Sequence, residues 1–131
     1  MSNALYDPGR ELFLESWLQL DIRVMLVKRS YLFKAAHRYI SSLADADNGR
    51  SASLTGKTAL DGIADADDIT IVAKAGVPCD SLVIYQNSGN DATSRVIAYV
   101  NSAITGLPFT PTVGQKMSIV WSNGKDRIFK L

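Results

Sequence analysis

Residues 80–100, Asp-Ser-Leu-Val-Ile-Tyr-Gln-Asn-Ser-Gly-Asn-Asp-Ala-Thr-Ser-Arg-Val-Ile-Ala-Tyr-Val, carry the pattern that decides the fold class. In residues 81–86, successive apolar side chains fall on both faces of a pleated strand, and residues 93–100 behave alike. Between them, residues 87–91 are Asn, Ser, Gly, Asn and Asp, which favour turns. Strands that are apolar on both faces are usually covered on both sides. The pattern therefore predicts a hairpin at the centre of the molecule.

A first helix is predicted near the start of the sequence. Asp7 would cap it, and Pro8 would take the first helical position, where a missing N–H has no cost. Its apolar side is formed by residues at helical spacing: Gly9, Leu12, Phe13, Ser16 and Trp17. We expect the large side chains to cover the open end of a sheet, because such side chains are usually buried. The alternative is that they face a partner.

A strand, a second helix and a loop are predicted next. Residues 18–28 alternate between apolar and polar side chains at first, which indicates a strand with one solvent-exposed face. Residues 33–44 have apolar side chains at helical spacing and predict a short helix. Residues 44–53 are small and polar, which is typical of an exposed loop.

The remainder predicts more strands and turns. Residues 57–63 form a possible strand weakened by a glycine, and residues 69–71 alternate as a half-buried strand. Residues 106–114 include two prolines and predict a loop. Residues 117–131 predict a second hairpin, with Asn123-Gly124 as its turn and residues 127–131 as its return strand.

These elements indicate a mainly β fold. Six or seven short strands and two short helices, without a regular strand–helix alternation, favour an antiparallel β-sandwich of jelly-roll-like type. A chain of 131 residues is long enough for one core, so residues 1–131 are expected to form a single domain.

The composition restricts the classes of partner. Fourteen basic and thirteen acidic residues give a net charge of +1, which argues against nucleic acid as a main partner. No apolar run approaches the ~20 residues of a membrane span, and the first residues lack the features of a signal peptide. One cysteine allows no internal disulfide. We therefore expect a soluble protein, made in the cytoplasm, that associates with protein.

Three stretches bear a partial likeness to ligand-binding motifs. Residues 55–58, Thr-Gly-Lys-Thr, resemble the end of a phosphate-binding loop, but its first glycine would fall at position 51, which is serine. Residues 45–49 and 65–68 are rich in Asp but do not fit the spacing of a calcium loop. Both Asp-rich stretches are interpreted as turns in which Asp bonds local main chain, with an adventitious cation as the alternative.

Catalytic chemistry has little support in the sequence. His37 is the single histidine, and nothing in the spacing joins it to carboxylates or to Cys79 as a metal site. Cys79 has no basic neighbour that would lower its pKa. We therefore predict no enzyme activity, no metal and no cofactor.

Several segments together resemble a family of small structural proteins of tailed bacteriophages. The resemblance runs from near the first residue to the last and rests on these segments: Ala4–Glu11, Leu54–Thr58, Asp65–Asp68, Leu82–Tyr85, Asp91–Tyr99, Gly106–Pro108 and Ile128–Leu131. Some members resemble capsid cement or decoration proteins, which are jelly-roll modules that sit on the head as homo-oligomers.

The resemblance implies a structural virion protein that binds the outside of a phage head and braces neighbouring major capsid protein subunits. It implies a homo-oligomer, a dimer or trimer, with the major capsid protein as partner and the capsid surface as location. The expected contact residues are aromatic anchors and two arginines that could bind capsid carboxylates: Tyr6, Arg10, Phe13, Trp17, Arg29, Tyr31 and Phe33. For each aromatic residue, ordinary core packing is the alternative.

Two other functions stay open from the sequence. One is a tail, neck or fibre-attachment component of the same virion. The other is a small host-directed enzyme or binding module, which would need a pocket that the sequence does not indicate.

Overall fold

The computed structural model describes residues 3–101, 104–121 and 127–131. Within them, antiparallel sheets dominate, with one α-helix and two short 3₁₀ helices, η1 and η2. The helices are α1 (Asp7–Gln19), η1 (Ile40–Ala46) and η2 (Leu60–Gly62). The strands are β1 (Ile22–Lys28), β2 (Asp47–Arg50), β3 (Ile63–Ala64), β4 (Ile69–Val72), β5 (Cys79–Gln86), β6 (Val96–Val100), β7 (Ile104–Thr105), β8 (Lys116–Trp121) and β9 (Phe129–Lys130).

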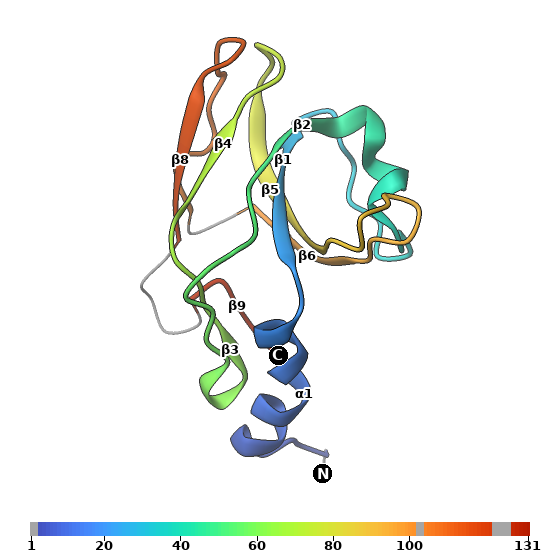
Figure 1. Cartoon of the computed structure of the whole chain (residues 1–131), viewed down its shortest axis with the longest axis vertical. Coiled ribbons are helices and arrows are strands. Elements are labelled where there is room, and N and C mark those ends of the chain that lie inside the picture. Colours follow the sequence, from blue (N-terminus) through green and yellow to red (C-terminus); the bar gives the residue numbers. More distant parts are fainter. Residues whose placement is uncertain (1–2, 102–103, 122–126) are drawn as a thin grey trace.

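A four-stranded sheet in the order β2-β1-β5-β6 forms the middle of the molecule (Figure 1). β1 and β5 lie at its centre, and side chains on both of their faces are buried. The predicted solvent-exposed face of β1 is therefore wrong. The strand also begins at Ile22 rather than at residue 18, because residues 18 and 19 still belong to α1.

One face of this sheet contributes to the larger core. Val24 and Leu26 of β1 and Ile84 of β5 join a buried cluster that also contains Ile71 of β4 and Ile119 of β8. Strands β4, β8 and β7 form a second antiparallel sheet, and Figure 1 shows β4 and β8 on one side of β1 and β5. Side chains of α1 close the lower end of this cluster.

The opposite face of the sheet is covered by η1, which Figure 1 shows on the other side of β1 and β5. Ile40, Leu43 and Ala46 are buried against Met25 and Tyr85. The spacing of three residues between these apolar positions suits a 3₁₀ helix, in which residues three apart lie above one another. The predicted short helix over 33–44 is therefore confirmed only in part: residues 40–44 lie in η1, whereas residues 31–39 contain no helix.

The loop prediction for residues 44–53 is wrong for residues 44–50, which complete η1 and form β2. Residues 51–53 belong to no helix or strand, and Asn48, Gly49 and Ser51 are buried. Position 49 requires a glycine because its backbone packs against strand β4. A Cβ at this position would collide with the Val72 carbonyl oxygen.

The central hairpin is confirmed in its pairing but only in part in its position. β5 and β6 pair antiparallel, yet β6 is the edge strand of the sheet, and Ile97 is 42% exposed. A turn region between them is stabilised by Ser94, whose hydroxyl accepts a hydrogen bond from the Ser88 amide at 3.0 Å and donates one to the Asn90 carbonyl at 2.9 Å.

The predicted second hairpin is wrong. β8 has the expected alternation, but its two neighbours are β4 and β7, so both of its edges are occupied. β9 pairs instead with β3, with Ala64 opposite Phe129. The expected Asn123-Gly124 turn lies outside the described residues.

The prediction for residues 57–63 is largely wrong, while that for 69–71 is confirmed by β4. Thr58 forms an isolated bridge with Asp65, and η2 occupies residues 60–62 of the expected strand. The mainly β, antiparallel character of the fold is confirmed. The jelly-roll-like order of a sandwich stays a prediction.

Candidate interaction surfaces

α1 and the residues that flank it expose large apolar side chains. Leu14 and Trp17 bury one side of the helix, whereas Leu12 is 60% and Phe13 64% exposed. The sheet-covering interpretation is therefore wrong for Leu12 and Phe13 and confirmed for Trp17, which is 4% exposed. We call the following exposed residues the α1 surface: Leu5, Tyr6, Leu12, Phe13 and Leu20.

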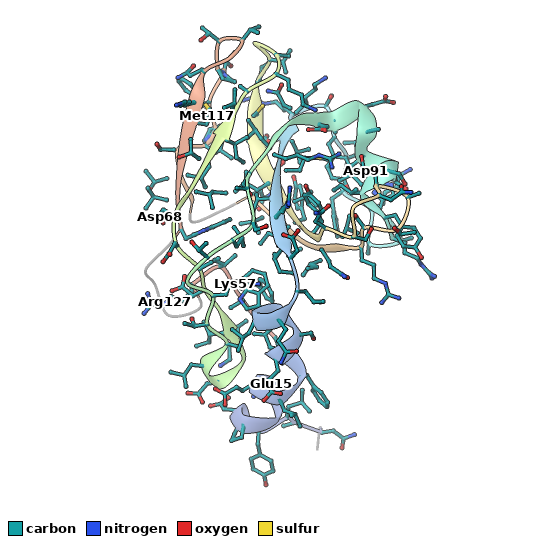
Figure 2. The ribbon with its side chains drawn as sticks, in the orientation of Figure 1. Glu15, Lys57, Asp68, Asp91, Met117 and Arg127 are labelled. Carbon is teal, nitrogen blue, oxygen red and sulfur yellow. The ribbon has the colours of Figure 1, made fainter. Side chains whose placement is uncertain are left out.

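The buried side of α1 is fixed by specific contacts. The ring of Trp17 meets that of Phe129 edge to face, with centroids 5.5 Å apart, and its Nε1 donates to the Asp65 carbonyl at 3.3 Å. Lys57 Nζ donates to the Leu20 carbonyl at 2.5 Å, near the end of the helix (Figure 2). Trp17 thus belongs to the core, the alternative that the sequence left open.

The start of α1 differs from the prediction. Tyr6, not Asp7, is the N-cap residue, and no side chain caps the helix. Arg10 Nη1 donates to the Leu5 carbonyl at 2.7 Å and to Asp7 Oδ1 at 3.1 Å. Arg10 therefore stabilises the first turn, while Tyr6 beside it is 86% exposed.

Tyr31 and Phe33 come together on a different part of the molecule. The Phe33 ring stacks on Tyr99 with centroids 5.2 Å apart, and the Tyr31 hydroxyl lies 2.9 Å from His37 Nδ1. Burial raises the pKa of Tyr31. These side chains line a cavity of about 180 Å³. The sequence pattern did not predict that Tyr99 and His37 lie beside Tyr31 and Phe33. In the predicted helix, the side chains of residues 33–37 would point in different directions.

Arg29 is the remaining predicted anchor. Its Nε lies 3.6 Å from Asp80 Oδ2; the Arg29 side chain is mostly exposed and that of Asp80 is partly exposed. The seven predicted residues are therefore divided between α1 and the segment 29–33, with Trp17 in the core.

Cys79 and the Asp-rich stretches have structural partners. Cys79 is buried and accepts a hydrogen bond from Asn48 Nδ2 at 3.2 Å; burial raises the pKa of its thiol. Asp68 Oδ1 accepts the Trp121 amide at 3.0 Å, and Asp67 Oδ2 accepts the Thr55 hydroxyl at 3.1 Å. Over the described ranges, no group of three or more His, Cys, Asp or Glu side chains is arranged to hold a metal ion.

A cluster of side chains around Arg50 links β2 to the turn after β5. Arg50 binds both carboxylate oxygens of Asp91 at 2.8 Å and Asp47 at 3.1 Å, and its guanidinium lies 5.4 Å from the centre of the Tyr85 ring. The hydrogen bonds from Arg50 lower the pKa of Asp91. The Asp47–Arg50 spacing was the only sequence signal for this cluster.

Comparisons with protein-family models, with curated proteins and with solved structures find no match to this chain. Among the described residues, no helix has both the length and the apolar character needed to cross a membrane.

Proposed function

We propose that this chain is a structural virion protein of the capsid cement or decoration type. It would bind the outside of a phage head and brace contacts between major capsid protein subunits. The observation that carries the proposal is the α1 surface, where five large apolar side chains are exposed to solvent. The resemblance of the sequence to tailed-phage structural proteins gives this surface its context.

The α1 surface suits association with protein. Exposed apolar area gains free energy when it is covered, at roughly 25 cal/mol per Å², and contiguous exposed patches often mark interaction sites. A weak contact of this kind becomes effective when many copies bind one particle, because linked sites act through avidity.

A jelly-roll-like sandwich belongs to the same proposal. Its support is the larger core cluster, which draws side chains from β1 and β5 of one sheet and from β4 and β8 of the other. We further propose that the chain acts as a dimer or trimer, with the α1 surface covered in the oligomer or on the head.

Quantitative mass spectrometry of purified virions tests the function. A copy number of the same order as that of the major capsid protein is expected. A few copies per particle would contradict cementing and favour a tail or neck component. Absence from the virion would end the structural proposal.

A reconstitution experiment then tests cementing directly. Purified chain is added to heads that lack it, and the temperature at which the heads release their DNA is measured. We expect a rise of this temperature with the wild-type chain and a smaller rise with Phe13→Ser. An equal rise with both proteins would show that the α1 surface does not contact the head.

A further inference from the structure

Three cavities meet at the first residue of β6. Val96 lines a cavity of about 180 Å³ beside Tyr31 and Phe33, one of about 230 Å³ beside Trp17 and Leu20, and one of about 490 Å³ beside Arg38. Val96 is common to all three linings, and we call the surface around this residue the β6 surface.

The β6 surface is basic. Lys34, Arg38 and Arg95 line its cavities, and none of them forms an ion pair with a carboxylate of the described residues. Among the described residues, no Asp or Glu lines these three cavities; Asp45 lines a neighbouring cavity that also includes Tyr31. Cations that have no carboxylate partner in the described chain, and that line cavities sharing Val96, attract a negatively charged partner.

The β6 surface also has exposed apolar side chains. Phe33 is 56% and Ile97 42% exposed, and the cavity beside Trp17 is lined mainly by apolar residues. A partner must therefore supply apolar groups as well as negative charge. A protein segment with acidic and large apolar side chains meets both requirements.

The edge of β6 gives such a segment a place to bind. The residue before the strand, Arg95, bridges to Tyr39, and the Val96 amide donates to the Arg38 carbonyl at 3.0 Å. Beyond Val96, β6 has a neighbouring strand only on its β5 side within the described chain. An extended peptide can add to such an edge through main-chain hydrogen bonds, while its side chains enter pockets on either side.

We propose that the β6 surface binds an extended, acidic polypeptide segment that inserts large apolar side chains into the cavities around Val96. Nucleic acid is the less favoured partner, because three unpaired cations around apolar cavities are few for phosphate binding. The proposal is tested without virions or heads, although the β6 surface shares Leu20 with the α1 surface and includes Tyr31 and Phe33 of the predicted contact residues.

Selection from a random 12-residue peptide display library against the full chain tests the proposal. Enriched peptides are expected to have an acidic excess and at least one large apolar residue. Their affinity, measured by fluorescence anisotropy, should fall at least tenfold for the double variant Arg38→Glu/Arg95→Glu. The control is Lys116→Glu/Lys130→Glu, which changes the net charge equally at exposed positions on β8 and β9 and should keep wild-type affinity.

A second variant, Arg38→Gln/Arg95→Gln, serves if the charge reversal prevents folding, and a smaller loss of affinity is expected from it. The proposal is overturned if no peptide is enriched, if the enriched peptides lack acidic residues, or if both variant pairs bind equally. Tighter binding of a labelled 12-nucleotide single strand than of any selected peptide would also overturn it.

Discussion

Single polar side chains join segments that the apolar pattern leaves unconnected. The amide of Asn48 is fully buried; its Oδ1 accepts the Ala75 amide at 2.7 Å, and its Nδ2 donates to the Ala75 carbonyl at 3.1 Å. An unmatched buried amide would be costly, so this pairing fixes β2 against the bend after β4. Nothing in the sequence distinguished Asn48 from a loop residue, because its partners are distant in the chain.

Asp21 also connects distant segments through hydrogen bonds, and its pKa gives a prediction of how stability depends on pH. Burial raises its pKa, but hydrogen bonds from Asn87, Ser53 and Arg23 outweigh burial and bring the pKa to about 2. Because this pKa lies below the unfolded value of 3.8, the stabilisation is present above about pH 4 and is lost as pH falls towards 2. The full effect would be somewhat over 2 kcal/mol; with the side chain 35% exposed, screening reduces it to about 1 kcal/mol.

Asp21→Asn should therefore lower the free energy of unfolding by about 1 kcal/mol at pH 7 and by much less near pH 2. Urea unfolding at both pH values measures the difference. Asp45→Asn is the control, because no hydrogen bond or ion pair of the Asp45 side chain is present in the described chain. A loss that stays constant between pH 7 and pH 2 would contradict the role given to the carboxylate.

At the scale of elements, apolar periodicity predicted the positions of strands better than it predicted which of their faces are buried. β4 and β8 lie where alternation predicted them, and β5 and β6 lie where apolar residues on both faces predicted strands. Periodicity could not tell that η1 covers the second face of β1, since that covering comes from a segment about 15 residues further along. For α1, the pattern found a helix but not its buried side: Leu14 packs inward, whereas Leu12 and Phe13 face solvent.

The exposed side of α1 predicts association without a change of stability. Leu12→Ser/Phe13→Ser should alter the free energy of unfolding by about 1 kcal/mol or less, because both side chains are mostly exposed. The double variant should be monomeric at concentrations at which the wild-type chain forms a dimer or trimer. Light scattering coupled to gel filtration measures the mass.

Glu15→Gln on the same helix is the matched control (Figure 2) and should leave the oligomer unchanged. A wild-type chain that is monomeric at all concentrations would remove the α1 surface as a self-association site. An oligomer that persists in the double variant would move the interface elsewhere.

At the scale of the whole molecule, the last described strand ties α1 to the body of the fold. β9 pairs with β3, the Leu131 amide donates to the Gly62 carbonyl at 2.9 Å, and the Phe129 ring contacts Trp17. Figure 1 shows β3, β9 and α1 together below the sheets. The Asn123-Gly124 turn pattern predicted that the last strand pairs with β8. A local pattern contains no information about distant strands, and β8 is already paired on both edges.

Phe129→Ala should therefore loosen the lower part of the molecule first. We expect a loss of roughly 2 kcal/mol in the free energy of unfolding, below the 3–5 kcal/mol typical of a fully buried phenylalanine, because Phe129 is only partly buried. Hydrogen exchange should quicken in α1 and β3 more than in β1 and β5, whose side chains are held in both core clusters. Lys130→Ala keeps the strand pairing and removes an exposed side chain, so it should change neither measurement. Uniformly faster exchange across all strands would mean that α1 and the sheets unfold as one unit, and that the contact with Trp17 does not mark a separate part of the fold.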